Sequence, residues 1–192
     1  MMSQRTMVVD LDRCFGCKSC EVACKQENGV ALGCTWNKVL TVGPSGTYPK
    51  VEMYYLPAMC QECKDAPCVK ACPTGSSYKN SDGVVLIDKE KCIGCRYCMM
   101  ACPYGVRTFN EETKVVEKCT LCTQLQAVGQ EPACVKICPA KCRFVGDSDD
   151  PNSEVAKVIN AAGSDSVHGL PDVGNKPSTR YILHRKTATW KE

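Results

Sequence analysis

The chain has 192 residues, enough for one or two small domains, and 18 of them are cysteine. No segment reaches the roughly 18 apolar residues that a membrane span needs, and the first ten residues contain no apolar run long enough for a signal peptide. The formal net charge of +3 counts every cysteine as a neutral thiol, so it depends on what the cysteines bind.

The predicted elements begin with a strand over residues 6–11, a short β-branched run. A helix follows that places Cys20 and Cys24 at positions i and i+4, one turn apart on the same face. Asn28-Gly29 is typical of a helix end. Two further strand-like segments, 36–42 and 50–56, predict a β-hairpin joined through Gly43-Pro44-Ser45-Gly46.

The later segments carry weaker signals. Residues 82–88 predict a turn followed by a short strand. Residues 153–162 predict a helix capped by Asn152 or Ser153. The polar stretch 164–178, rich in glycine and proline, predicts a loop, and residues 180–184 predict a last strand before a mobile tail.

Four cysteine motifs dominate this pattern. They comprise Cys14, Cys17, Cys20 and Cys24; Cys60, Cys63, Cys68 and Cys72; Cys92, Cys95, Cys98 and Cys102; and Cys119, Cys122, Cys134 and Cys138. The third motif reads C-x2-C-x2-C-x3-C-P, the spacing that holds a [4Fe–4S] cluster in bacterial ferredoxins. Three cysteines on a tight loop ligate one cube, and the fourth points toward a neighbouring cluster.

Two other uses of these cysteines agree less well with the spacing. Cysteine content is in the range of disulfide scaffolds, but closely packed thiols repeated four times find separate partners with difficulty. Zinc sites use paired C-x2-C motifs, but they need no third cysteine and no trailing C-P. Iron–sulfur clusters are therefore favoured. Cys34 and Cys142 belong to no motif, and we expect Cys34 to be a small buried residue and Cys142 to lie beside a cluster without binding it.

Bound clusters would reverse the charge of the chain. An oxidised core of about +2 with four thiolates adds about −2 per site, so four sites would bring the net charge to about −5. The basic residues near the motifs then either compensate buried anionic clusters or are ordinary surface charges, and a nucleic-acid-binding patch is disfavoured. They are Lys18, Lys25, Lys64, Lys70, Arg96 and Lys118.

The layout predicts an α+β fold made of two interleaved bacterial two-cluster ferredoxin-like units with short β-hairpin insertions. Motifs one and four, with the hairpin 35–57, form the first unit, over residues 1–57 and 111–150. Motifs two and three form the second unit, over residues 58–110. Residues 151–192 form a C-terminal helix and tail.

The order and spacing of the motifs, with stretches 23–28, 72–75 and 144–151, resemble the four-cluster iron–sulfur subunit of complex iron–sulfur molybdoenzymes of the dimethyl-sulfoxide-reductase type. Polysulfide, thiosulfate, tetrathionate, arsenate and selenate reductases and formate dehydrogenases have similar subunits. The resemblance covers about residues 5–160. In nitrate-reductase relatives tryptophan occupies the Cys95 position and that cluster has three irons, so cysteine here implies four [4Fe–4S] clusters.

The resemblance also implies which cysteines share a cluster. Cluster A would be held by Cys14, Cys17, Cys20 and Cys138; cluster B by Cys119, Cys122, Cys134 and Cys24; cluster C by Cys60, Cys63, Cys68 and Cys102; and cluster D by Cys92, Cys95, Cys98 and Cys72. The spacing agrees with this exchange, since in every motif the fourth cysteine is set beyond the third. Because metal-binding energy is also folding energy, folding is expected to depend on cluster loading.

No catalytic residue is predicted, because nothing in the sequence resembles a base, a nucleophile or an open metal site. The two histidines, His168 and His184, lie in the tail and are expected to be structural or exposed. The resemblance implies an electron-transfer subunit without catalysis of its own, which relays single electrons between a molybdopterin (molybdenum or tungsten) catalytic subunit and a quinol-linked membrane subunit or a soluble donor.

The implied location is the periphery of the cytoplasmic membrane, on either face, with the periplasm reached through a partner's twin-arginine signal. Two alternatives stay open at this point. One is an electron-transfer subunit of a hydrogenase or formate-linked complex, and the other is a zinc-rich structural or interaction module.

Overall fold

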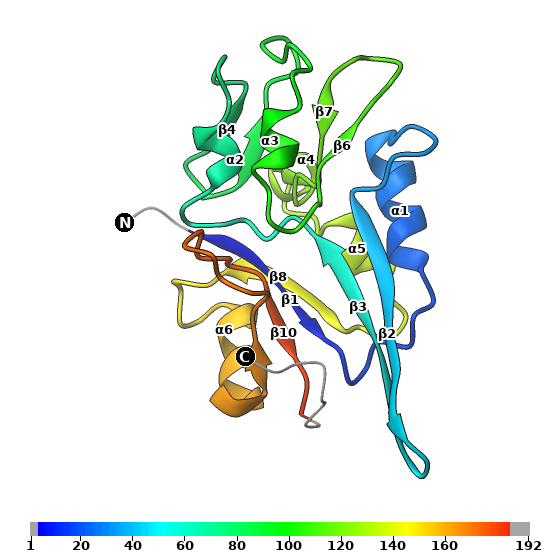
Figure 1. The fold of residues 1–192 in the computed structure, drawn as a ribbon. Helices are drawn as coiled ribbons and strands as arrows, with labels where there is room; N and C mark the ends of the chain where they lie inside the picture. The colour runs from blue at the N-terminus through cyan, green and yellow to red at the C-terminus, as the bar shows by residue number, and fades with distance from the viewer. Residues whose placement is uncertain (1–3, 185–192) are drawn as a thin grey trace.

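The computed structural model describes residues 4–184, and its central element is a four-stranded sheet in the order β8-β1-β10-β9. The strands are β1 (Arg5–Asp10), β8 (Arg143–Asp147), β9 (Val167–His168) and β10 (Arg180–Ile182). Strand β1 pairs antiparallel with β8 and parallel with β10, with Val8 opposite both Phe144 and Arg180. The sheet therefore joins the two ends of the described chain (Figure 1).

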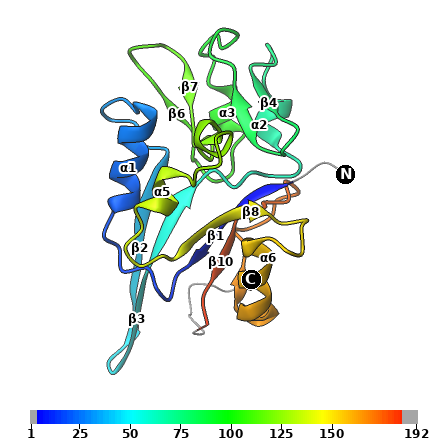
Figure 2. The ribbon, with the colours of Figure 1, turned by 180° about the vertical axis from the view of Figure 1, so that it is seen from behind.

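A helix covers one face of this sheet and the main core lies on the other. Helix α6 (Glu154–Ala162) packs against β8 and β1, where Val8 and Val155 are fully buried (Figure 2). Because side chains alternate along a strand, Met7 points into the main core instead. The predicted Ser153 cap is confirmed, since its side chain accepts a hydrogen bond from the Ala156 N–H at 3.1 Å.

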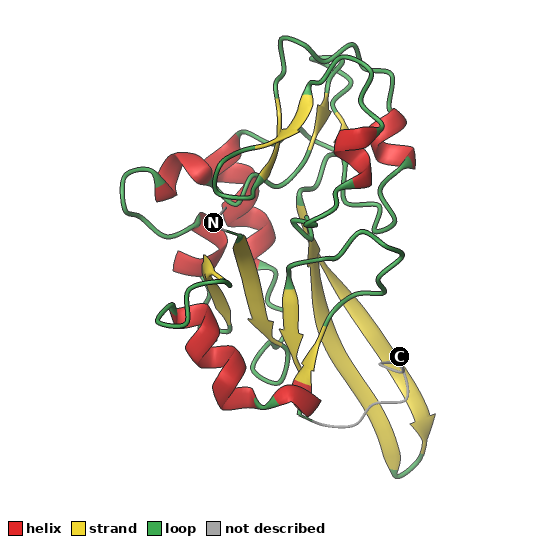
Figure 3. Cartoon of the chain, turned by 90° about the vertical axis from the view of Figure 1, so that its left-hand side faces the viewer, coloured by secondary structure: helices red, strands yellow, loops and turns green. Residues whose placement is uncertain are grey.

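The predicted hairpin forms, but its strands are longer than expected. Strands β2 (Asn37–Thr47) and β3 (Lys50–Met59) continue through the expected connection at 43–46 and project from the rest of the molecule (Figure 3). A register shift between Val42 and Ser45 accommodates the glycines and the proline within the ladder, so the chain reverses later, at residues 48–49.

Short elements make up the region between residues 60 and 138. The strand pairs are β4 (Ser77–Lys79) with β5 (Val85–Ile87), and β6 (Thr108–Phe109) with β7 (Val116–Glu117). The helices are α2 (Pro67–Lys70), α3 (Tyr97–Met100), α4 (Thr123–Gln126) and α5 (Ala133–Lys136), each four residues long. Before this region, α1 (Ser19–Asn28) is longer, and Gly29 ends it in the left-handed conformation, as predicted.

The mixed α+β class predicted from the sequence is confirmed. The loop expected over 164–178 is partly wrong, because it contains a 3-10 turn, η1 (Ser164–Ser166), and strand β9, which pairs with β10. The tail expected beyond residue 184 lies outside the described residues. Within residues 4–184, no helix combines the length and the apolar character that crossing a bilayer requires.

Candidate metal centres

Four cavities of nearly equal size are each lined by four motif cysteines. Their volumes, including the parts open to solvent, are about 310 to 330 Å³. Cavity A contains Cys14, Cys17, Cys20 and Cys138; cavity B contains Cys24, Cys119, Cys122 and Cys134; cavity C contains Cys60, Cys63, Cys68 and Cys102; and cavity D contains Cys72, Cys92, Cys95 and Cys98. These are the same four groupings that the family resemblance implied for clusters A to D.

Paired helices distribute the cysteines between neighbouring cavities. On α1, Cys20 faces cavity A and Cys24 faces cavity B, four residues or about 6 Å further along the axis. The adjacent α5 runs the opposite way, with Cys134 in cavity B and Cys138, just beyond its end, in cavity A. Each cavity in this pair is therefore completed by a cysteine from a distant motif.

Helices α2 and α3 repeat this exchange for cavities C and D. Cys68 faces cavity C, and Cys72, one turn later, faces cavity D. Cys98 on α3 faces cavity D, and Cys102 faces cavity C. The two helices are packed together, so neither cavity closes unless both are in place.

In motifs one and three, residues in the left-handed conformation bend the first loop around the cavity. Gly16 and Lys18 both have positive φ in motif one, and Gly94 and Arg96 repeat this in motif three. A Cβ atom on Gly16 would overlap the ring of Tyr55, so glycine is required there for space as well as for conformation.

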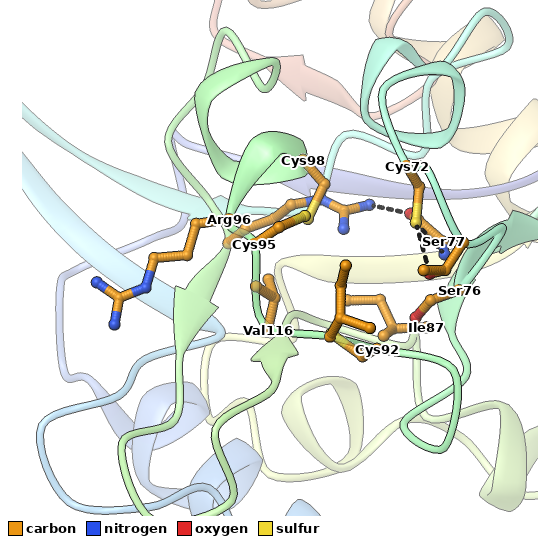
Figure 4. Close-up of a pocket in the computed structure, with 12 residues that line it drawn as sticks. Cys72, Ser76, Ser77, Ile87, Cys92, Cys95, Arg96, Cys98 and Val116 are labelled. Atoms are coloured by element: carbon orange, nitrogen blue, oxygen red, sulfur yellow. Dashed lines mark hydrogen bonds between the residues drawn. The ribbon is translucent and has the colours of Figure 1, made fainter.

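The cavities differ in exposure. All four cysteines of cavity B are buried, whereas cavity A contains the exposed Cys17 and cavity D the exposed Cys95. Cavity D, which draws its cysteines from two separate motifs, is shown in Figure 4, where Arg96 extends away from it. Arg107 lines both D and C, Met59 of cavity B precedes Cys60 of cavity C, and α1 presents cysteines to both B and A. The cavities therefore follow the order D–C–B–A, with the exposed cysteines in the two outer ones.

The chemistry of the donor sets fits a positively charged occupant with anionic acceptor atoms. Burial raises the pKa of Cys24 to about 12 and also raises the pKa of Cys60, so these thiols ionise readily only beside a compensating cation. Two donors that line cavity B, Trp36 Nε1 and Thr120 Oγ1, have no hydrogen-bond partner within residues 4–184. In an iron–sulfur cluster, the iron ions would compensate the thiolates and the sulfides would accept hydrogen bonds from the two donors.

Three buried cations lie near the cavities, and only one of them was expected from the sequence. Lys118 pairs with the buried Glu62, Nζ to Oε1, at 3.3 Å, and loss of either partner of such a pair costs about 3–5 kcal/mol. Arg107 and Arg143 were missed, although each stands five residues after a cysteine followed by proline, in the pattern C-P-x3-R. The other basic residues named earlier are exposed or half-buried.

The two cysteines outside the motifs lie where the sequence predicts, one buried in the core and one beside a cysteine cavity. Cys34 is buried, and its thiol donates to the Phe109 carbonyl at 3.3 Å. Cys142 lines cavity A, with its sulfur 3.5 Å from that of Cys138, and a hydrogen bond from its thiol lowers the pKa of Cys14.

The two histidines contact other parts of the fold. His184 is exposed and pairs with Asp12, Nδ1 to Oδ2, at 2.8 Å. His168 contacts the Leu183 carbonyl through Nε2 at 3.2 Å. Neither histidine lines any of the four cavities.

Comparison with known proteins gives matches along most of the chain. A 4Fe-4S dicluster domain model matches residues 51–148, and a 4Fe-4S binding domain model matches residues 11–35. A protein from Halobacterium salinarum, named as an iron–sulfur subunit of dimethyl sulfoxide reductase, is 45% identical over 94% of this chain and 79% of its own length.

Two further relatives act on different substrates, according to their names. A sulfite dehydrogenase subunit from Allochromatium vinosum is 41% identical over 97% of this chain and 85% of its own length. The arsenate respiratory reductase iron–sulfur subunit from a Shewanella species is 34% identical over 92% of this chain and 94% of its own length. The similarity to both relatives therefore covers nearly the whole chain.

Proposed function

Because this chain belongs to the family of 4Fe–4S dicluster proteins that includes the iron–sulfur subunits of dimethyl-sulfoxide-reductase-type molybdoenzymes, we propose that it relays single electrons through four [4Fe–4S] clusters. Members of the family are electron-transfer subunits of oxidoreductase complexes. For this chain, the proposal adds the number of clusters, their ligands and their order.

One observation carries the proposal: four cavities of nearly equal volume each present four cysteine sulfurs, drawn from two motifs. We assign clusters A to D to cavities A to D, with the cysteines of each cavity as ligands. A bound [4Fe–4S] cluster supplies a one-electron couple whose potential depends on charge, hydrogen bonds and exposure. The chain fixes the position of each cluster and limits the exposure of the inner two.

The order D–C–B–A supports a wire with two ends. No cysteine of the inner cavities B and C is exposed, and exposed cysteines mark the outer ones, Cys17 at A and Cys95 at D. Electrons would therefore enter at one outer cluster and leave at the other. The relatives include both reductases and a dehydrogenase, so we assign the direction of flow to the partners.

The partners follow from the same family. We propose a molybdopterin catalytic subunit, with molybdenum or tungsten, at one end of the wire, and a quinol-linked membrane subunit or a soluble donor at the other. This would place the complex at the periphery of the cytoplasmic membrane, on either face. The division into a 58–110 unit nested within a unit of residues 1–57 and 111–150 belongs to the same proposal.

A zinc-binding structural module is a weaker candidate. Across the part of the chain that the structure describes, no group of three or more histidine, cysteine, aspartate or glutamate side chains is arranged as a site for one metal ion. Zinc requires four ligands within about 2.3 Å of a single centre. Cysteines that surround a larger space suit a cube better.

The test is metal analysis of anaerobically purified protein with electron paramagnetic resonance (EPR) of its reduced form. The expected result is about sixteen irons and sixteen sulfides per chain, with signals that show spin coupling between clusters. About four zinc ions without sulfide would overturn the proposal. Isolation of the intact complex tests the partner separately, since molybdenum or tungsten is expected there and nickel would indicate a hydrogenase.

A further inference from the structure

The junction between cavities C and D contains a buried arginine. Arg107 lines both cavities and is 4% exposed. Its Nη2 donates to the Ser77 hydroxyl at 2.8 Å, and the Ser77 N–H donates to the sulfur of Cys72 at 3.4 Å. Its other terminal nitrogen, Nη1, has no hydrogen-bond partner among the residues described. The guanidinium therefore lies between the two sets of cysteines.

The junction between cavities A and B contains a second buried arginine. Arg143 lines cavity A and is 3% exposed. Its Nη2 donates to Asn37 Oδ1 at 3.1 Å, and its Nη1 lies 3.8 Å from the sulfur of Met59. Asn37 and Met59 both line cavity B. This guanidinium reaches from one cavity to the wall of the next, as Arg107 does.

The middle junction, between cavities B and C, contains an ion pair instead. The Lys118 ammonium donates to the carbonyl of Cys119, a cavity B residue, at 2.5 Å and lies 3.3 Å from Glu62. Glu62 Oε2 in turn accepts the N–H of Val85, which lines cavity C, at 2.6 Å. A positive and a negative charge thus lie together, and their sum is neutral.

The two arginines have no such compensation. Within residues 4–184 neither of them forms an ion pair with a carboxylate. Arg107 shares the lining of cavity C with Cys68 and the lining of cavity D with Cys98. Arg143 shares the lining of cavity A with Cys20 and contacts the wall of cavity B. Each guanidinium therefore lies between two sets of cysteines.

We propose that Arg107 and Arg143 are paired tuning residues, each of which raises the reduction potentials of the two clusters beside it, while the Lys118–Glu62 pair leaves the middle junction neutral. The inference rests on the proposed four-cluster function. A cluster becomes more negative by one charge when it is reduced, and a buried cation stabilises that state because little solvent screens it. Arg107 acts on clusters C and D, and Arg143 on A and B.

The experiment is a potentiometric titration, followed by EPR, of the full chain carrying Arg107→Gln or Arg143→Gln. Each variant is expected to lower two of the four potentials by at least a tenfold change in the one-electron equilibrium, about 59 mV. Arg107→Gln should lower the potentials of clusters C and D, Arg143→Gln should lower those of clusters A and B, and the double variant should lower all four potentials. General loosening of the fold would instead shift all four potentials in either single variant.

Three further variants separate charge from structure. Arg107→Lys keeps the positive charge, so the reduction potentials of clusters C and D should stay closer to the wild-type values than in Arg107→Gln. Glu62→Gln leaves the Lys118 charge uncompensated and should raise two potentials, those of B and C. Lys157→Gln removes an exposed charge on α6, away from the cavities, and should change none of them.

Iron content distinguishes the two proposals. A wild-type chain without about sixteen irons would refute the four-cluster function itself. A fully loaded Arg107→Gln or Arg143→Gln protein with wild-type potentials would refute only the tuning role. If Arg107→Gln and Arg143→Gln lose iron, the Glu62→Gln protein tests the tuning role instead. Unchanged potentials of clusters B and C in a fully loaded Glu62→Gln sample would contradict the electrostatic account.

Discussion

The half of the chain around cavities A and B and the half around cavities C and D share one ligand exchange but differ in their surroundings. The A/B half adjoins the four-stranded sheet and the long hairpin, and its core includes Met7, Trp36, Leu121 and Tyr181. The core of the C/D half consists of six buried residues, three of which are cysteines. Those six are Cys63, Ala66, Cys68, Val85, Cys98 and Val116.

This difference indicates how much each half depends on its clusters. Val85 and Val116 are the only large aliphatic side chains fully buried in this cluster, and its other hydrophobic side chains are only partly buried. Such a small core offsets little of the conformational entropy that is lost when some fifty residues are ordered. The C/D half should be held together mainly by metal–sulfur bonds, and the A/B half should keep part of its structure without them.

The largest expected effect is that of removing iron by anaerobic chelation. Hydrogen exchange by mass spectrometry should show complete loss of protection in β4, β5, β6 and β7, because the core of their half is small and half of its buried residues are cysteines. Strands β1 and β8 should stay protected by the sheet and by α6. Equal loss of protection in both halves would contradict the comparison.

A smaller effect is expected when one proposed ligand of cluster C is removed. Cys102→Ala should lower the iron content from about sixteen to about twelve per chain, since cavity C has no spare thiol in its lining. The matched control is Cys142→Ala, which removes a buried sulfur 3.5 Å from Cys138 but no proposed ligand. Metal analysis should find full loading in this control, and a loss of four irons there would make Cys142 a ligand.

Hydrogen bonds to sulfur allow a finer comparison of the two halves. Asn175 Nδ2 donates to the sulfur of Cys63 in cavity C at 3.0 Å and to the Tyr104 hydroxyl at 2.8 Å. Asn28 Nδ2 lies farther from its sulfur, 3.7 Å from Cys122 in cavity B, and donates to a backbone carbonyl at 2.9 Å. Asn175→Ala should lower one potential by up to about 59 mV, because the lost donor stabilised the reduced cluster. Asn28→Ala should lower a potential by less, and redox titration of the two variants ranks them.

The smallest effect is expected far from the cavities. Ser153→Ala removes the cap of α6 and should lower the free energy of unfolding of the loaded protein by about 1 kcal/mol. Chemical denaturation measures this change. The four reduction potentials should be unaffected, since α6 lines none of the cavities. A shifted potential would indicate that the sheet transmits strain to the clusters.

Local signals explain most of what the sequence predicted correctly. The strand near residues 6–11, the helix that ends at Gly29 and the Ser153 cap each depend on a few adjacent residues. The iron–sulfur family was also predicted correctly, because cysteine spacing and loop geometry determine each other. The cysteine groupings came from the family resemblance, and the spacing agreed with them without specifying the partners.

Features that depend on distant contacts were not predicted. Strand β9 forms only because β10 returns beside β1. Asn175 reaches Cys63 across 112 positions of sequence, so no local pattern connects them. Arg107 and Arg143 are buried because each lies at the junction of two cavities. The repeated C-P-x3-R spacing was nevertheless visible in the sequence and would have singled out both arginines.

The exchange of cysteines between paired helices sets an order for assembly on the ribosome. Every cysteine of cavities C and D has been synthesised once Cys102 has emerged, so these two cavities can be filled while the rest of the chain is still growing. Cavity B must wait for Cys134 and cavity A for Cys138, more than a hundred residues after Cys14. A chain that stops before residue 138 would leave the first motif with its cluster unfinished, so completion of cluster A would show that synthesis has passed residue 138.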